Sequence, residues 1–398
     1  MKGVNEYCDA SRAPGAPKDA RQRSNVTLTA RERVLAENHP AIAPAFAHGM
    51  REWLRRERAA AWAACGMFER VALAYLGLSS GMIAVFAENL AHPLRLAATQ
   101  ALVALLILAL CRSEARAVDR TKFGAEAGNR ADAKSRPNFP ERCWHFGRHW
   151  YPHLFFLFCF EELGRLVHLV QPGWQDAKLM AFDRWLTGVQ PTVWLEQFAT
   201  PGRNDLMQFV YITYFTYLLI VGGVLYYRRD WRGYWSVMTY SAVAYAIGYF
   251  IAICFPIESP WFAMVGSWHG ELRGGAATAL INFIEHYGRV RGAAFPSEHV
   301  AGAVAATWGA WRHRRWLFWV MLPVVLCMCV STVWGRYHYV ADVFGGVITG
   351  TVGYVIGGWL MAKRNSVATI SSTVRSPETL LERPPCPGLQ GHDALQSL

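Results

Sequence analysis

A series of apolar segments, each close to the length that crosses a bilayer as a helix, constrains this chain more than any other feature. Residues 207–227 and 236–257 contain no charged side chain, and about 20 apolar residues span the hydrocarbon core of a membrane as a helix. Only 17% of the 398 residues are charged, compared with about 25% in a typical soluble domain. We therefore predict an all-α fold, a polytopic transmembrane helical bundle. The eight predicted spans cover 71–90, 94–111, 151–170, 207–227, 236–257, 296–311, 316–335 and 341–362.

The distribution of basic residues over the polar segments predicts the orientation of these spans. With eight spans, five basic segments lie on one side of the membrane, and the positive-inside rule assigns that side to the cytoplasm. Both termini are therefore expected in the cytoplasm, and the long 258–295 loop on the extracytoplasmic side, periplasmic or lumenal. The five basic segments are the N-terminal tail, 112–148, 228–235, 312–315 and Lys363-Arg364.

Composition divides the chain into four regions. Residues 1–69 lack a sustained apolar stripe, apart from one candidate surface helix over 45–65, so we expect a basic and mostly disordered cytoplasmic tail. Residues 70–112 are predicted to form two accessory transmembrane helices, and 150–362 the membrane core. The polar residues 363–398 are expected to be a second disordered cytoplasmic tail.

The charge distribution argues against a nucleic-acid-binding protein, and the cysteine spacing argues against a disulfide-bonded or zinc-binding one. The net charge of +11 would suggest nucleic acid in a soluble protein, but here the basic residues lie in the tail and alternate loops, where anionic lipid headgroups are the expected partners. The nine cysteines show neither a paired framework nor a zinc spacing, so we expect no structural disulfide. The polar N-terminal region predicts no cleavable signal peptide.

Two histidines begin or end predicted helices next to polar loops. Pro296 and Ser297 are ordinary residues for the start of a helix, and His299 follows in the first turn, where free backbone N–H groups attract anions. His338 and Asp342 are four residues apart and share a helix face. An aspartate in that position fixes the tautomer of the imidazole and leaves its other nitrogen free to attack.

The predicted topology brings these residues together. Because 296–311 runs inward and 316–335 runs outward, His299 and His338 both lie at the extracytoplasmic ends of their helices. Arg336 lies at the same face. Ionisable groups at membrane depth are costly and indicate function, so we interpret this cluster as a functional site.

At these residues the chain resembles a known family. Pro296-Ser297-Glu298-His299, followed by His338-x3-Asp342, is similar to the second and third signature blocks of the type-2 phosphatidic acid phosphatase superfamily. Ser331 is in register with the third block, but Thr332 occupies its arginine position, and Glu298 replaces the usual glycine before the histidine. The first block, Lys-x6-Arg-Pro, is not recognisable.

The motifs that depart from the superfamily pattern resemble those of one of its branches, the inositol phosphorylceramide synthases. The shared features are Phe255-Pro256 with Pro260-Trp261, the Phe-Pro-Ser-x-His block, His338-Tyr339-x-x-Asp342-Val343, and Asp183-Arg184-Trp185. Sphingomyelin synthases share the His-Tyr-x-x-Asp-Val part. The resemblance covers about 180–360 and implies a six-helix phosphatase-type core, with activity as a lipid phosphate phosphatase or an inositolphosphotransferase-like phosphotransferase.

The resemblance also implies a role for each site residue. His338 is the nucleophile that forms a phosphohistidine, Asp342 orients it, and His299 is the general acid and base. Candidate phosphate-binding residues are Arg336, Ser297, Arg289 and Arg291, the last two in place of the missing first-block cations. No metal and no cofactor is expected, and the partners are a lipid phosphate or phospholipid substrate and the bilayer, with no nucleic acid.

The same residues also fit two other kinds of protein, a transporter or channel and a zinc protein. A transporter or channel with a His/Asp proton relay predicts ionisable groups in mid-membrane on several broken helices, whereas here they gather at one face. A zinc site of His299, His338 and Asp342 is disfavoured because Arg336 would repel a cation. Glu161, Glu162 and Arg165, inside the third span, form either a substrate or proton site or a buried Glu161–Arg165 pair.

Overall fold

The computed structural model describes residues 42–126 and 139–374, and their regular structure is helical. A single isolated parallel bridge joins Ile257 and Ala293 within these ranges. The all-α class is therefore confirmed. The elements, in chain order, are α2 (Ile42–Ala64), α3 (Met67–Val85), η2 (Ala87–Asn89), α4 (Pro93–Glu126), α5 (Phe139–Leu166), α6 (Asp176–Thr187), α7 (Pro191–Trp194), η4 (Leu195–Phe198), α8 (Pro201–Ile212), α9 (Tyr214–Tyr227), α10 (Trp231–Cys254), α11 (Pro260–Ala263), α12 (Ala276–Gly288), α13 (Glu298–His313), α14 (Arg315–Trp334) and α15 (Val340–Val374).

The chain divides into two units, and the boundary between them falls within the sequence of α2. The first comprises residues 1–60 and the second residues 61–398. A helix is therefore present where the candidate surface helix over 45–65 was predicted. The predicted disorder of 1–41 and of 375–398 concerns residues outside the described ranges.

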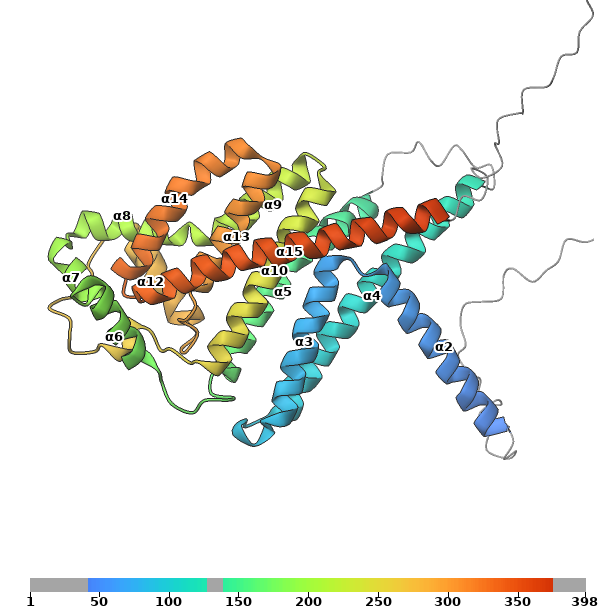
Figure 1. The fold of residues 1–398 in the computed structure, drawn as a ribbon, viewed down its shortest axis with the longest axis horizontal. Coiled ribbons are helices and arrows are strands. Elements are labelled where there is room, and N and C mark those ends of the chain that lie inside the picture. The colour runs from blue at the N-terminus through green and yellow to red at the C-terminus, as the bar shows by residue number, and fades with distance from the viewer. Residues whose placement is uncertain (1–41, 127–138, 375–398) are drawn as a thin grey trace, which may run out of the picture. The chain divides into compact units, whose positions relative to one another are not determined.

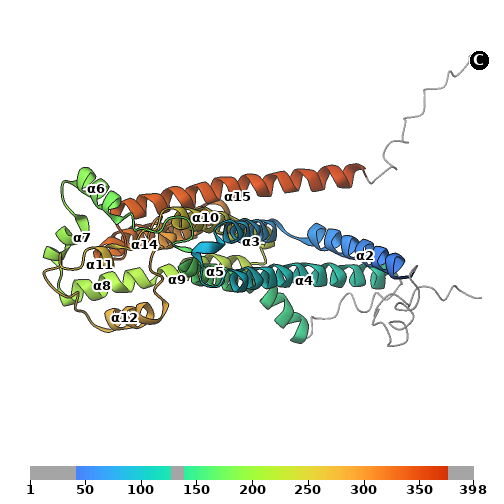
Figure 2. The same ribbon diagram turned by 90° about the horizontal axis from the view of Figure 1, so that it is seen from below.

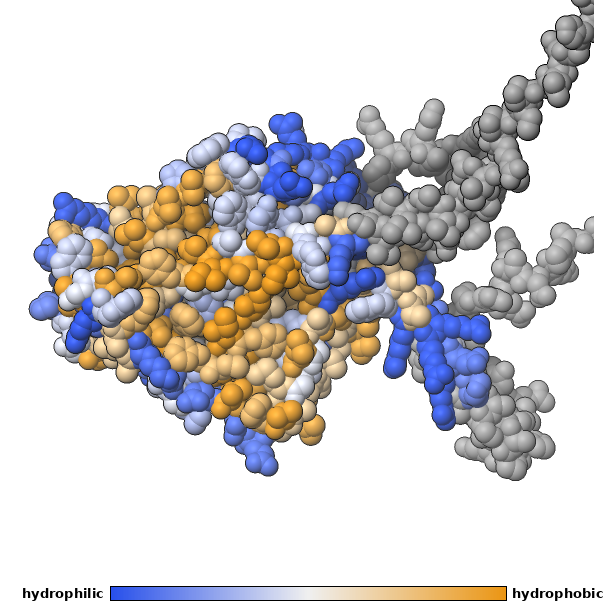
Figure 3. All heavy atoms as spheres, in the orientation of Figure 1, coloured by the Kyte–Doolittle hydropathy of each residue, from blue (hydrophilic) through white to orange (hydrophobic). Residues whose placement is uncertain are grey.

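Within the described residues, five helices are long and apolar enough to cross a membrane: α3, α4, α10, α14 and α15. The pair α8 and α9, bent by 41° at Thr213, forms a sixth candidate. These helices support an integral, multi-pass membrane protein. The two remaining predicted spans correspond to α5, which contains many charged residues, and to α13, which has only 16 residues. Figure 3 shows apolar residues over the middle of one face, with hydrophilic residues concentrated toward its edges.

Two predicted boundaries are wrong. Helix α4 continues to Glu126 and α5 begins at Phe139, so most of the predicted 112–148 loop is helical, and α15 continues to Val374, beyond the end of the predicted 341–362 span. Salt bridges account for the first difference, because the buried guanidinium of Arg148 in α5 bonds Glu69 of α3 and Glu114 of α4, each at 2.6 Å. Charges that look like a solvated loop in the sequence instead join three helices.

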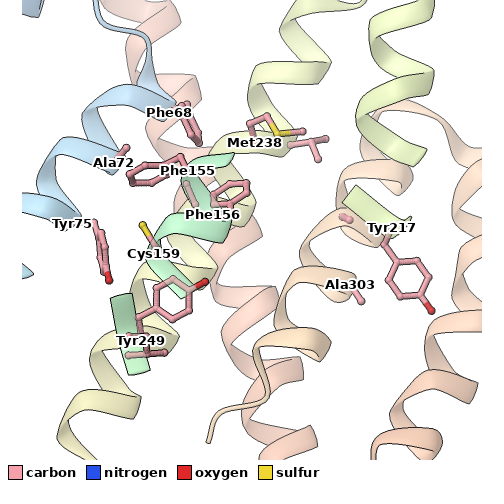
Figure 4. Packing of buried hydrophobic residues seen from close by; sticks show 14 of the residues in the cluster. Phe68, Ala72, Tyr75, Phe155, Phe156, Cys159, Tyr217, Met238, Tyr249 and Ala303 are labelled. Carbon is pink, nitrogen blue, oxygen red and sulfur yellow. The ribbon is translucent and has the colours of Figure 1, made fainter. Parts of the chain in front are cut away.

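Aromatic packing holds the accessory helix α3 against the core (Figure 4). Phe68 of α3 lies edge-on to Phe155 and Phe156 of α5, with ring centroids 6.0 and 5.8 Å apart. Edge-to-face pairs of this kind add about 0.5–1.5 kcal/mol beyond area burial. Tyr75, about two turns further along the same face of α3, contacts Tyr249 of α10 with the two rings tilted and their centroids 5.9 Å apart.

Glycines on α15 allow the central three-helix packing of α10, α13 and α15 (Figures 1 and 2). A Cβ atom at Gly346 or Gly350 would lie 2.5 Å from a backbone oxygen of α13 or its cap, and one at Gly353 or Gly357 would collide with Tyr240 of α10. Small residues spaced four apart in this way let two helices approach closely.

We expect Gly350→Ala to destabilise the protein by about 1–3 kcal/mol, the usual cost of an overpacked contact. The cost arises because the added methyl group would meet the carbonyl oxygen of Ala301. Gly358→Ala is the matched control, since the nearest atom to its new methyl group is a Tyr240 side-chain carbon at 4.0 Å. Thermal unfolding of the purified variants in one detergent measures both, and equal melting temperatures would contradict the packing described above.

Candidate active site

Two buried aspartates from α6 assemble the loops at one end of the helices. The short helices α6, α7, α8 and α12 gather at this end in both views (Figures 1 and 2). Asp183 accepts hydrogen bonds from the N–H groups of Val340 and Ala341, each at 2.9 Å, and so caps the start of α15. Burial raises the pKa of this carboxyl, while the two backbone bonds oppose the rise. The cap holds the segment that contains His338 against α6.

Asp176 performs the same task for the neighbouring loop. It accepts from the backbone N–H groups of Glu258 and Ser259, at 2.9 and 3.2 Å, and from the hydroxyl of Tyr339 at 3.0 Å. Ser259 has a φ of 99°, in the left-handed region that non-glycine residues seldom adopt. Such strain persists only where surrounding contacts enforce it, and it clusters at functional sites.

The His338 side chain is oriented by two acceptors on one of its nitrogens. Nδ1 lies 3.0 Å from the carbonyl oxygen of Ala294 and 3.3 Å from Oδ2 of Asp342. A carbonyl oxygen can only accept, so Nδ1 holds the proton and Nε2 presents its lone pair. Burial lowers the pKa of His338 to about 4, although the bond to Ala294 opposes this. The imidazole is therefore neutral at physiological pH, with Nε2 available as a nucleophile.

His299 meets that nucleophilic nitrogen. Its Nδ1 lies 3.1 Å from Nε2 of His338, so the pair predicted to converge from 39 residues apart is in direct contact. Because Nε2 of His338 is unprotonated, the N–H of His299 donates. The ring of His299 lies edge-on to Tyr214 at 4.1 Å and 5.6 Å from Tyr211. These tyrosines flank the bend at Thr213, so the break between α8 and α9 supports His299.

Ser297 connects the two histidine blocks through its backbone. Its N–H donates to the carbonyl oxygen of Asp342 at 3.0 Å, and its hydroxyl accepts from the N–H of Val300 at 3.4 Å as the N-cap of α13. The side chain is fully buried. In this structure the hydroxyl is thus engaged in helix capping.

Both histidines border an apolar cavity of about 590 Å³ between α5, α9, α12 and α13. Leu157 and Phe160 of α5 and Leu218 and Leu219 of α9 line one part, while His299 and His338 belong to a polar end. The polar end also contains Glu258, Glu285, Arg289 and Glu298. A cavity of this kind suits an amphiphile with its polar group at the histidines.

A second and larger cleft, of about 1280 Å³, lies over the loop that precedes α12. Arg336 lines this cleft, where it stacks on Trp268 at 4.1 Å and bonds the carbonyl of Gly270 at 2.8 Å and Glu196 at 3.3 Å. Burial raises the pKa of Glu196, but bonds from the N–H groups of His269 and Gly270, with the charge of Arg336, bring it below its ordinary value. Arg336 also has a left-handed φ of 65°.

The remaining predicted cations occupy different positions. Arg289 lines both cavities, and its guanidinium bonds Glu285 at 2.5 Å and lies over Tyr337 at 5.7 Å. Arg291 pairs with Glu258 and has an exposed side chain. Among the predicted cations, Arg289 is therefore the one that borders the same cavity as the histidines.

The charged residues of the third predicted span separate as well. Glu162 is buried and accepts from Nε2 of Gln100 in α4 at 2.8 Å, whereas Glu161 and Arg165 are exposed. The predicted alternative of a buried Glu161–Arg165 pair is therefore wrong. The reason is helical phase, since Glu162 rather than Glu161 faces α4.

Sequence reasoning missed Asp176, Asp183, Glu196, Tyr211 and Tyr214 as site residues. Of these five residues, only Asp183 belongs to a motif of the family resemblance, the Asp-Arg-Trp segment, and the resemblance implies no role for that segment. The other four become recognisable only when segments 73 or more residues apart in the chain meet. No group of three or more His, Cys, Asp or Glu side chains in the described ranges has the arrangement of metal ligands.

Comparison with known proteins gave one finding. A family model described as the PAP2 superfamily matches residues 177–356. This match supports the PAP2 superfamily. It covers both histidine blocks of the PAP2 region and Asp183, and it supports an enzyme of the lipid phosphatase type in general terms. It does not extend to the inositolphosphotransferase branch. No curated protein and no solved structure matched the chain.

Proposed function

We propose that this chain is a membrane-embedded lipid phosphatase or phosphotransferase that acts through a phosphohistidine at His338. The observation that best supports the proposal is the 3.1 Å contact between Nδ1 of His299 and Nε2 of His338 at the polar end of an apolar cavity. One imidazole offers a lone pair and the other a proton at the same point. The substrate is a lipid phosphate or the headgroup phosphodiester of a phospholipid.

Phosphate binding must first separate the two rings, because 3.1 Å leaves no room for a phosphorus atom between them. The lone pair on Nε2 of His338 then forms the N–P bond while the P–O bond to the leaving group breaks. His299, protonated at both nitrogens beside the anionic phosphate, gives a proton to the leaving oxygen and ends neutral. Asp342 stabilises the positive charge of the phosphorylated imidazole ring.

The second step reverses these roles. Neutral His299 takes the proton of an incoming water or alcohol, the oxygen of that molecule bonds to phosphorus, and the N–P bond breaks to return the lone pair to His338. Arg289, which borders both cavities, is the cation best situated to hold phosphate oxygens, as arginine does through its planar fork. The larger cleft lined by Arg336 gives room for a headgroup or an acceptor alcohol, which supports transfer of the inositolphosphotransferase type.

The proposed orientation puts both termini in the cytoplasm and the site on the extracytoplasmic side. We expect Val265→Cys in the outer loop to react with an impermeant thiol reagent applied to intact cells, in a background without other cysteines. Arg312→Cys, in the basic turn before α14, should react only after permeabilisation. Both positions are exposed in the structure. Reaction of the second variant in intact cells would move the site to the other side of the membrane.

An activity panel tests the proposed function directly. The purified full-length chain, in detergent with EDTA, is given lipid phosphates and phospholipids with and without acceptor alcohols, inositol among them. We expect release of phosphate, or transfer to an alcohol, that persists in the chelator because protein cations and backbone N–H groups stabilise the transferred group. A requirement for one divalent ion, or no turnover of any lipid phosphate, would refute the proposal.

A further inference from the structure

Helix α12, in the segment between α10 and α13, presents an exposed apolar face. Leu280, Phe283 and Tyr287 are all exposed, and 63% of Phe283 is accessible. Their spacings of three and four residues place them on one side of the helix, which we call the apolar strip. Adjoining apolar side chains that are exposed in this way mark a surface that contacts a protein, a ligand or a membrane.

A second side of α12 packs against the active-site region. Ile281 is fully buried in a cluster with Tyr211 and Tyr337, and the ring of Tyr211 lies 5.6 Å from that of His299. Ile284, on the same side of the helix, lines the apolar cavity that the two histidines border. Helix α12 is therefore one wall of that cavity, and packing fixes it there.

A third side of α12 borders the larger cleft. Asn282 and His286 line that cleft, and both are exposed. With about 3.6 residues per turn, the apolar strip lies between this polar side and Ile284. The apolar surface of the helix therefore continues from the lining of the cavity to the exterior of the protein, where it ends at the polar side.

The helices beside α12 expose apolar side chains as well. Asp205 of α8 accepts hydrogen bonds from the N–H and hydroxyl groups of Thr278, at 2.9 and 3.0 Å, and so ties α12 to α8. Helix α8 exposes Leu206 and Phe209 and belongs to the bent pair that is a candidate span. Phe215 of α9, also exposed, lines the apolar cavity. Because the apolar surface next to α12 belongs to a candidate span, the partner that fits the apolar strip is the bilayer.

We propose that α12 is an interfacial helix whose apolar strip is embedded in the leaflet nearest the active site. Leucine and phenylalanine enter the boundary between headgroups and acyl chains, and tyrosine is enriched at the same depth. The polar side of the helix stays in water at the larger cleft. This inference goes beyond the proposed function, because it concerns the contact of the protein with the membrane. It holds the apolar cavity, which α12 also lines, beside the lipids of that leaflet.

Spin labels on the full-length chain, in a background without other cysteines, measure the depth of α12. Leu280→Cys and Phe283→Cys carry the label on the apolar strip, and Asn282→Cys and His286→Cys are matched controls on the polar side; all four positions are exposed. In phosphatidylcholine vesicles, power saturation compares access of dioxygen, which dissolves in hydrocarbon, with that of a water-soluble nickel chelate. We expect the labels on the strip at about 5–10 Å below the headgroup boundary, the usual depth of an interfacial helix, and both control labels in water.

Two results would overturn the inference. The first is access of the nickel chelate to the apolar strip equal to its access to the polar side, which would place the whole helix in water. The second is low access of both reagents to the strip, which would show that protein covers it; spin–spin broadening that grows with the protein-to-lipid ratio would identify that protein as a second copy of the chain. The measurement needs no turnover, so absence of lipid phosphatase activity would refute the proposed function alone.

Discussion

Replacing His299 by alanine should lower turnover of lipid phosphates by about 10²–10⁴-fold, the usual contribution of a general acid and base. The lost group is the one whose Nδ1 lies 3.1 Å from Nε2 of His338. A lipid alkoxide leaves poorly without a proton. An activated aryl phosphate has a leaving group that needs none, so formation of the phosphoenzyme from that substrate should recover a large part of the loss.

The comparison of substrates distinguishes a catalytic defect from a folding defect. A misfolded His299→Ala protein would lose activity toward both substrates equally, and its melting temperature would fall. Tyr214→Phe is a useful companion variant, because it keeps the ring that packs edge-on to His299 and removes only the hydroxyl. If His299→Ala keeps the wild-type melting temperature but loses activity toward the aryl phosphate as fully as toward the lipid, the role of His299 as the general acid is wrong.

Asp342→Asn should preserve the fold but lower the rate by more than about 10²-fold and by less than the roughly 10⁴-fold typical of a triad aspartate. An amide cannot support positive charge on His338, which accounts for the loss. The loss stays below the upper figure because the Ala294 carbonyl, at 3.0 Å, still holds the Nδ1 proton, and Asp342 lies further away at 3.3 Å.

Two measurements check the Asp342 prediction. The first is the single-turnover rate of phosphoenzyme formation, and the second is thermal stability, since Oδ2 of Asp342 also accepts from the N–H of Tyr339 at 2.8 Å. The amide oxygen of asparagine can keep that bond. Wild-type activity in Asp342→Asn would show that the Ala294 carbonyl orients His338 unaided.

Much of the fold follows from local sequence properties. Uncharged runs such as 236–257 predict α10 because every backbone N–H and C=O group inside a bilayer must be hydrogen-bonded within the protein, as it is in a helix. The spacing of Gly346 and Gly350 likewise predicts close packing, since it concerns a single helix face. The contact of His299 with His338 follows from topology, because two helices that run in opposite directions return their ends to one side.

The rest depends on contacts between segments far apart in the chain. Nothing in the sequence around Arg148 indicates that its charge is neutralised by Glu69 and Glu114, so the sequence predicts a loop where the structure has helices. The direction of the Arg336 side chain, toward Glu196 and the outer cleft, depends on a left-handed residue and on a loop more than 60 residues away.

Trapping the covalent intermediate tests the central claim most directly. The full-length protein is mixed with a phosphorus-labelled lipid phosphate, quenched without acid, and digested, and the labelled peptide is identified. The account predicts acid-labile label on His338, none in His338→Ala, and slow labelling in His299→Ala that an aryl phosphate accelerates. Label retained by His338→Ala but absent from His299→Ala would reverse the two roles, and turnover by either variant at the wild-type rate would contradict a phosphohistidine mechanism at this site.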